Sequence, residues 1–244
     1  MGSPYDSEII EKCFQRKISV HKLFADIPRR ALDAYNAIKS THVYRKGTLL
    51  LLEGRPPDGI YVLREGHAKL SIATHKKKSR ILRIAGPGEI LGLSATISKE
   101  SYEVTAETLD ACQADFVERQ DFMRFLCQHS EVCLRVVQLL ACNLRDTYEQ
   151  LRLLSTSRSP AQRLARVLLQ WCDEHGENDS RGIRVKIGLT QEETAQLVGV
   201  SRETVTRLLG QLKNERIISL DRSTLLILNK AALQSMVIPR IVSE

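Results

Sequence analysis

The chain has 244 residues, with 43% hydrophobic and 27% charged residues, a balance that fits one large globular domain or two modest ones. Its formal net charge of +7 favours an acidic partner, although many basic proteins bind no nucleic acid. No apolar run of about 18 residues and no secretion signal occur, so we expect a cytoplasmic protein with no membrane partner.

The first half of the chain changes from helical to β-rich character. Residues 1–40 are polar, with scattered apolar positions that are typical of short helices. From about residue 43, short runs rich in β-formers alternate with glycines, and the predicted strands are residues 48–52, 60–63, 68–73, 80–84 and 103–109. Many short strands with regular turns predict a barrel, sandwich or jelly roll. The basic stretch 75–80 is interpreted as a hairpin tip, with a DNA contact as the less favoured alternative.

Residues 131–154 contain neither glycine nor proline and predict one long helix. Apolar residues recur there with heptad spacing, at Val137, Leu140, Leu144, Thr147, Leu151 and Leu154. This narrow seam fits a helix packed on its own domain, and it also fits a two-stranded coiled coil between two copies. Because DNA half-sites are related by two-fold symmetry, the coiled coil becomes the favoured reading once a DNA-binding motif is found.

Residues 155–160 have linker composition and predict a domain boundary. An amphipathic helix over 161–175, a polar loop over 176–182 and a short strand over 184–187 are expected next. Near the C-terminus, residues 217–220 and 225–228 flank a turn and predict a β-hairpin wing.

Residues 190–212 predict two helices joined by a tight turn. Thr190 followed by Glu193 is a capping box, which marks a helix start. Gly199 stands where a helix-turn-helix usually carries glycine, and Ser201 is positioned to cap the second helix. A two-helix DNA-binding motif is therefore predicted.

The second helix of the motif separates its residues by face. At about 100° per residue, Val205, Leu208, Leu209 and Leu212 share the core side. Arg202, Glu203, Thr206 and Arg207 share the opposite side. Arginine can pair bidentately with guanine, and a carboxylate can accept from the amino group of cytosine. A solvated charged face is the alternative, but the number of agreeing positions favours base reading.

The order of β-roll, long helix, linker and winged helix-turn-helix resembles the bacterial cyclic-AMP receptor protein and fumarate–nitrate regulator (Crp/Fnr) family of transcription regulators. The resemblance covers nearly the whole chain and depends on the motifs at residues 46–54, 59–70, 87–95 and 188–212. It implies a homodimer that binds double-stranded DNA and contacts RNA polymerase. It also implies that Arg202, Glu203 and Arg207 read bases, and that Thr190 contacts the DNA backbone.

Within that resemblance, residues 201–207 (SRETVTR) are similar to the receptor-protein branch, which recognises a TGTGA-type half-site. The DNA-binding residues implied are Arg202, Glu203, Arg207, Thr206, Ser201 and Thr190. The fumarate–nitrate branch carries a serine in its reading set, and this sequence does not restore that pattern.

The resemblance places an effector pocket at Gly92, Leu93, Ser94, Ser101 and Tyr102. The cyclic-AMP branch carries a glutamate where this chain has Leu93, and an arginine where it has Glu100. A phosphate needs a cationic or N–H-rich partner, so cyclic AMP is unsupported. Haem is unsupported because Ser94 replaces a histidine, and an iron–sulfur cluster because Cys13 is the only cysteine near the N-terminus. The effector therefore remains unknown.

Six cysteines occur without a Cys-x-x-Cys pair, which predicts free thiols rather than a metal site. Control by thiol oxidation is an alternative to an effector, with Cys13, Cys112 and Cys172 as candidates. A second alternative is a ligand-binding module whose helix-turn-helix contacts protein. No catalytic triad, phosphate-binding loop or metal-ligand set is present, so an enzyme is not expected.

We therefore predict an α+β protein. Its parts are a β-roll sensor domain with N-terminal helices at residues 1–130 and a dimerisation helix at 131–155. A winged helix-turn-helix DNA-binding domain occupies 156–244. The sensor domain is expected to be a double-stranded β-helix, which is a jelly roll similar to cyclic-nucleotide-binding domains.

Overall fold

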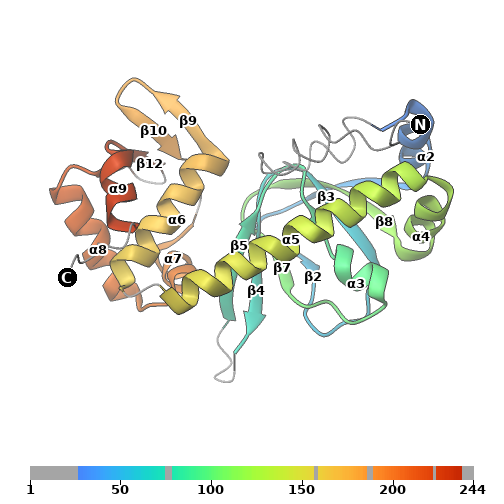
Figure 1. Ribbon diagram of the computed structural model, residues 1–244, viewed down its shortest axis with the longest axis horizontal. Coiled ribbons are helices and arrows are strands. Elements are labelled where there is room, and N and C mark those ends of the chain that lie inside the picture. The colour runs from blue at the N-terminus through green and yellow to red at the C-terminus, as the bar shows by residue number, and fades with distance from the viewer. Residues whose placement is uncertain (1–26, 75–78, 157–158, 186–188, 222–223, 238–244) are drawn as a thin grey trace, which may run out of the picture. The chain divides into compact units, whose positions relative to one another are not determined.

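The computed structural model describes residues 27–74, 79–156, 159–185, 189–221 and 224–237 (Figure 1). The described residues divide into two compact units, one with the residues up to Leu70 and from Ile84 to Tyr148, the other with Ser71–Arg83 and the residues from Glu149 on. No helix among the described residues combines the length and the apolar character that crossing a membrane requires.

The β-roll, most of which lies in the first unit, has two four-stranded sheets with strand orders β1-β8-β3-β6 and β2-β7-β4-β5. Its strands are β1 (Ser40–Tyr44), β2 (Leu49–Leu51), β3 (Gly59–Glu65), β4 (Ala68–Ala73), β5 (Ser79–Ala85), β6 (Ile90–Leu91), β7 (Thr105–Thr108) and β8 (Cys112–Glu118). Three helices accompany them: α2 (Arg29–Ile38), α3 (Leu93–Ser98) and α4 (Arg119–Gln128). This architecture confirms the predicted jelly roll.

Strand β3 explains why the roll has two layers of core. Ile60 and Val62 point from one face of β3 into a cluster with residues of α2 and α4, such as Tyr35 and Phe122. Leu63 belongs to the cluster between the sheets. Because both faces of the strand are buried, its sequence is nearly continuously apolar instead of alternating.

Strands β1, β6 and β8 and helices α3 and α4 were not expected individually from the sequence. Residues 40–44 extend the β-rich region earlier than predicted, as β1 pairs antiparallel with β8. Strand β8 carries Gln113, Asp115 and Glu118 among its seven residues, so its apolar pattern is interrupted. Only its pairing with both β1 and β3 places it at the centre of its sheet.

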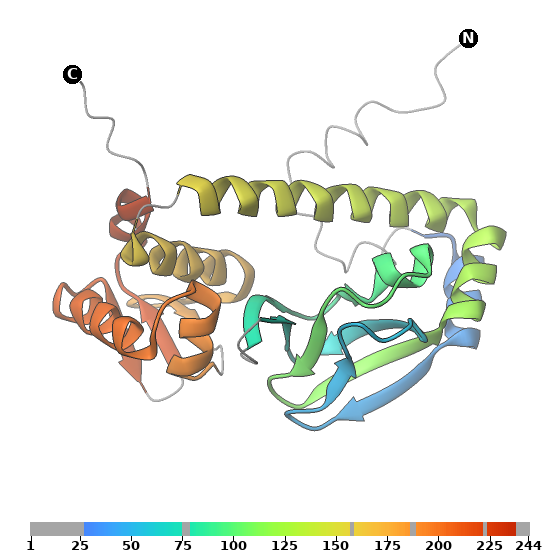
Figure 2. The same ribbon diagram turned by 90° about the horizontal axis from the view of Figure 1, so that it is seen from below.

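Helix α5 (Ser130–Thr156) is one continuous helix, as Figure 2 shows. Val132, Val136 and Leu139 are buried in the same cluster as Ile60 and Phe122. The helix therefore packs one face on its own domain. Val137 and Leu144 of the predicted seam are exposed on its other faces.

The C-terminal part of the second unit is a winged helix-turn-helix. Its helices are α6 (Pro160–His175), α7 (Gln191–Val198), α8 (Arg202–Asn214) and α9 (Lys230–Val237), and its strands are β9 (Gly176–Asp179), β10 (Gly182–Val185), β11 (Ile218–Asp221) and β12 (Thr224–Ile227). The strands form one sheet in the order β11-β12-β10-β9. Leu164, Leu168 and Leu233 are among its most buried side chains, and full burial of each stabilises the fold by about 1.5–3 kcal/mol.

Residues 176–182 were predicted to be a polar loop, and this was wrong. Residues 176–179 form strand β9, which pairs with β10 in the register Gly182↔Asp179 to Val185↔Gly176. The polar sequence is compatible with a strand because β9 is an edge strand with mostly exposed side chains. The last two residues of the strand predicted at 184–187 lie outside the described residues.

Candidate nucleic-acid interface and effector site

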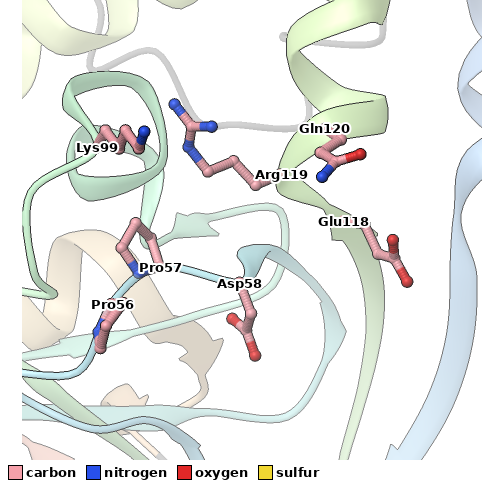
Figure 3. Close-up of a pocket in the computed structure, with 7 residues that line it drawn as sticks. All are labelled: Pro56, Pro57, Asp58, Lys99, Glu118, Arg119 and Gln120. Carbon is pink, nitrogen blue, oxygen red and sulfur yellow. The ribbon is translucent and has the colours of Figure 1, made fainter.

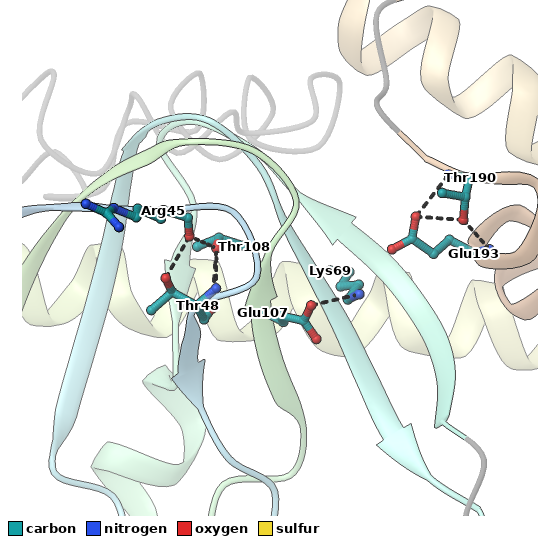
Figure 4. A network of polar contacts seen from close by, with 7 residues as sticks. All are labelled: Arg45, Thr48, Lys69, Glu107, Thr108, Thr190 and Glu193. Carbon is teal, nitrogen blue, oxygen red and sulfur yellow. Dashed lines mark hydrogen bonds and ion pairs between the residues drawn. The ribbon is translucent and has the colours of Figure 1, made fainter. Parts of the chain in front are cut away.

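The capping box predicted at the start of α7 is present. The Thr190 hydroxyl accepts from the backbone N–H of Glu193 at 3.1 Å, and the Glu193 carboxylate accepts from the backbone N–H of Thr190 at 2.9 Å (Figure 4). Two N–H groups that a helix start leaves unpaired are thereby satisfied. This fixes the residue at which α7 begins.

The turn between α7 and α8 has the expected geometry. Gly199 ends α7 in the left-handed conformation, with a φ of 73°, which glycine adopts without steric cost. Ser201 then caps α8 by accepting from the backbone N–H of Thr204. These local contacts set the direction in which α8 leaves the turn.

Helix α8 separates core from solvent as predicted. Val205, Leu208, Leu209 and Leu212 are buried in the core of the unit. Arg202, Glu203, Thr206 and Arg207 are all exposed. The structure therefore brings the four candidate reading side chains together on one accessible face.

Local hydrogen bonds influence the exposed set. The backbone N–H of Glu203 and the Ser201 hydroxyl hold the pKa of the Glu203 carboxyl below its usual range, so it is an acceptor at neutral pH. Arg207 donates to the Gln211 side chain at 3.4 Å. Oγ1 of Thr206 lies 2.6 Å from Oε1 of Gln191, a residue that the sequence analysis did not identify. No local pattern signals that contact, since the two residues are 15 positions apart.

Some side chains of the predicted dimer seam are exposed, and one packs against its own domain. Val137 and Leu144 are 56% and 55% exposed, and Thr147 is exposed, whereas Leu140 is half-buried against its own domain. The side chains of Leu151 and Leu154 lie outside the described residues. The exposed apolar side chains among the described ones recur at spacings of three and four, at Leu134, Val137, Ala141, Leu144 and Tyr148.

The expected effector residues divide into buried and exposed groups. Leu93 and Tyr102 are 4% and 5% exposed and belong to the hydrophobic cores, whereas Ser94 and Ser101 face solvent. Gly92 caps α3 with a φ of 75°, and a Cβ there would lie 2.7 Å from the ring of Tyr102. The ring of Tyr102 therefore fills the space beside Gly92.

The hydroxyl of Tyr102 lies within hydrogen-bond distance of four polar atoms. It lies 3.2 Å from the backbone nitrogens of Asp58 and Gly59, 2.8 Å from the carbonyl of Gly59 and 2.6 Å from the Asp58 carboxylate. Burial and the hydrogen bond to Asp58 raise the pKa of Tyr102, so the hydroxyl stays protonated. The side chain thus joins the segment after α3 to the start of β3.

A pocket of about 440 Å³ lies beside Asp58, the residue whose carboxylate accepts from the Tyr102 hydroxyl (Figure 3). Two basic and two acidic side chains line it, and none of the expected effector residues does; its lining is Pro56, Pro57, Asp58, Lys99, Glu118, Arg119 and Gln120. Arg119 uses its Nε to donate to the carbonyl of Thr96 at 2.9 Å.

A buried carboxylate that sequence reasoning missed stands in β8. Asp115 is fully buried and accepts from Tyr35, Lys39, Thr41 and Arg64 at 2.6–3.1 Å. Burial raises the pKa of Asp115, but the hydrogen bonds from Thr41, Lys39 and Arg64 outweigh it, and the pKa lies below its usual value. The network ties α2, β1 and β3 to the central strand.

The cysteines proposed for thiol control are poorly suited to it. Burial raises the pKa of Cys112 to about 11, and burial also raises the pKa of Cys172. Because the thiolate is the reactive form, both are slow nucleophiles at neutral pH. Cys13 lies outside the described residues. Among the described residues, no three His, Cys, Asp or Glu side chains are arranged to hold a metal ion.

Comparison with known families matches both units. The Cyclic nucleotide-binding domain family matches residues 41–129, and the Crp-like helix-turn-helix domain family matches residues 162–236. Together they span the β-roll and the DNA-binding unit.

Relatives of this chain occur in several bacteria. The chain is 29% identical over 184 residues to the CRP-like cAMP-activated global transcriptional regulator of Mycobacterium tuberculosis. The aligned residues cover 75% of this chain and 82% of the relative. It is 27% identical over 203 residues to the Anaerobic regulatory protein of Bacillus subtilis, covering 81% and 84%.

Among solved structures, FixK2 from Bradyrhizobium japonicum has a TM-score of 0.72 at 20% identity, covering 82% of this chain and 97% of that one. The regulator TTHB099 from Thermus thermophilus has a TM-score of 0.68 at 25% identity, covering 80% and 96%. These similarities agree with the architecture described above.

Proposed function

Because the chain belongs to the Crp/Fnr family of DNA-binding transcription regulators, we propose that two copies of it bind a TGTGA-type palindrome. The protein is a regulator and not an enzyme. Arg202, Glu203 and Arg207 read the bases of each half-site, with Thr206 beside them. Ser201 and Thr190 approach the DNA backbone, since the start of a helix offers free N–H groups to phosphate. The protein acts in the cytoplasm, where bacterial DNA is.

The observation that carries this proposal is the exposed face of α8. Arginine, glutamate and arginine stand there at spacings that place all three on the side opposite the buried leucines. Major-groove recognition requires such donors and acceptors on one helix face. A helix used only for protein contacts has no need of this donor and acceptor pattern, which disfavours the alternative role.

Dimerisation through α5 is part of the proposal. The stripe of Leu134, Val137, Ala141, Leu144 and Tyr148 is exposed in the single chain and has the spacing of a coiled-coil seam. Pairing two such helices would present two α8 helices to half-sites one helical turn apart, about 34 Å. RNA polymerase is the further partner that the family membership suggests.

The β-roll is proposed to function without cyclic AMP. Leu93 and Tyr102 occupy core positions, and Glu100 is an exposed carboxylate that would repel a phosphate. The Mycobacterium tuberculosis relative is described as cAMP-activated. In this chain Leu93 and Glu100 stand where the resemblance to the cyclic-AMP branch implies a glutamate and an arginine. Control by thiol oxidation is less supported, because Cys112 and Cys172 are buried.

The base-reading role is tested with the variant Arg207→Ala on a palindromic and a scrambled duplex. We expect the preference for the palindrome to fall by about 1–3 kcal/mol, while salt-sensitive binding to the scrambled duplex remains. Lys213→Ala is the matched control, since it removes an exposed cation from the same helix outside the reading set. Equal weakening by Arg207→Ala on both duplexes would contradict base reading.

A further inference from the structure

A hydrogen bond joins the two helices of the motif on their solvent-exposed side. Oγ1 of Thr206 in α8 lies 2.6 Å from Oε1 of Gln191, and both side chains are exposed. Gln191 is the first residue of α7, directly after the capping Thr190, and Thr206 directly precedes Arg207. The contact therefore lies between the backbone-contacting end of the motif and its reading face.

The hydroxyl of Thr206 has a second neighbour. Its oxygen is also 3.0 Å from the carbonyl oxygen of Arg202, one turn earlier in α8. A hydroxyl has one hydrogen to donate, and the two ends of a glutamine carboxamide are assigned from their neighbours rather than observed. Thr206 donates either to Gln191 or to the Arg202 carbonyl, and in the second case it accepts from the Gln191 amide.

Both arrangements have the same consequence for DNA recognition. The hydroxyl hydrogen of Thr206 is used inside the protein, so the side chain offers the groove an acceptor and a methyl group but no donor. The second polar group of the Gln191 carboxamide has no partner among the described residues, and it stays available on the same face.

We propose that Gln191 is a specificity-determining residue that acts through Thr206. It fixes the hydroxyl so that the base pair facing Thr206 is read by an acceptor and a methyl. This inference rests on the proposed function of α8. In the major groove adenine presents an amino donor where guanine presents the O6 acceptor, and the A·T pair carries the thymine methyl that a G·C pair lacks. The pair facing Thr206 is therefore selected as A·T.

The experiment measures binding of the full-length protein to a set of duplexes in which each base pair of the half-site is replaced in turn. We expect Gln191→Ala to reduce the preference for A·T over G·C at one position of each half-site by about tenfold, because the freed hydroxyl can then rotate and donate. Thr206→Val should reduce the preference at the same position. The double variant should be no less selective there than the less selective of the two single variants, because both substitutions remove the same contact.

Two control variants separate this role from a structural one. Thr206→Ser retains the hydroxyl and removes the methyl, so it should keep the part of the preference that depends on the acceptor. Gln196→Ala removes a glutamine from the same helix that makes no hydrogen bond to α8 among the described residues, and should leave all preferences unchanged. Thermal unfolding of each variant establishes that it is folded.

Three results would overturn the inference. Uniform weakening of Gln191→Ala on every duplex would make Gln191 a backbone contact. Unchanged preference in Gln191→Ala would leave it without a role in reading. An unmodified protein that does not distinguish the half-site from scrambled DNA would reject the proposed function itself, and this inference with it.

Discussion

The DNA-binding unit and the β-roll place their polar chemistry in opposite ways. In the helix-turn-helix, Arg202, Glu203 and Arg207 stand exposed on a helix whose other face is core. In the β-roll, Leu93 and Tyr102 are buried at positions where the resemblance placed an effector pocket, and a polar network surrounds the buried Asp115. One unit keeps its functional groups available, and the other fills its own expected site.

The two units also differ in how far apart along the sequence their contacting residues lie. The capping box of α7 links residues three positions apart, whereas the partners of Asp115 lie 51 to 80 positions away. Contacts of the first kind leave a pattern in the sequence, and contacts of the second kind depend on strand pairing. Substitutions in the two units should therefore differ in how much they change the unfolding free energy and in which contacts they remove.

The largest effect is expected in the β-roll, from Asp115→Ala. Removing the carboxylate leaves Lys39 and Arg64 without their partner, and the unfolding free energy of the β-roll should fall by about 3 kcal/mol. Chemical denaturation followed by circular dichroism measures it. Asp33→Ala, at an exposed position of α2, should change stability by less than about 0.5 kcal/mol. Similar losses in the two variants would contradict the network.

Acidification tests the same network without a mutation. Because the folded-state pKa of Asp115 is lowered, its stabilising contribution is present above the unfolded pKa of about 3.9 and is lost as the pH falls through the folded value. The stability difference between the unmodified protein and Asp115→Asn should therefore shrink below about pH 4. A difference that grows on acidification would reverse the assigned sign.

An intermediate effect is expected from Tyr102→Phe. This variant tests how firmly Tyr102 is held in the space beside Gly92, where the effector pocket was expected. The variant leaves the N–H groups of Asp58 and Gly59 without the hydroxyl and should cost about 1–3 kcal/mol in unfolding free energy. Tyr44→Phe is the control, because the Tyr44 hydroxyl has no hydrogen bond among the described residues. Equal stability of the two variants would mean that the Tyr102 hydroxyl contributes nothing.

A smaller effect is expected in the DNA-binding unit from Thr190→Ala. Loss of the cap on the Glu193 N–H should lower the unfolding free energy by about 1 kcal/mol. Thermal unfolding measures the change, and Thr190→Ser, which keeps the hydroxyl, should restore most of it. If serine and alanine destabilise equally, the cap is not the reason.

The smallest effect is a gain in stability, from Gly210→Ala in α8. A Cβ at this exposed helical position has nothing within 4 Å, so the variant should stabilise the unit by about 0.5–1 kcal/mol. Gly199→Ala should do the opposite, because its φ of 73° is unfavourable for alanine. A loss of stability in Gly210→Ala would indicate a contact that the structure lacks.

The sequence predicted the DNA-binding unit more closely than the β-roll. Thr190, Gly199 and Ser201 signal their roles through neighbours within four residues, so the motif and its faces were predicted. Strand β8 and the Asp115 network were not, because a buried carboxylate can be identified only once distant cations are placed beside it. The same reason hid the Gln191–Thr206 contact.

The most direct test of the account is equilibrium binding of the purified, untreated protein to a TGTGA…TCACA duplex and to a scrambled duplex. It is made at near-physiological salt, with and without cyclic AMP. We predict selective binding to the palindrome without any ligand, and affinities that cyclic AMP leaves unchanged. Unselective binding that becomes selective only when cyclic AMP is added would contradict the account, because the space beside Gly92 would then have to open for a ligand.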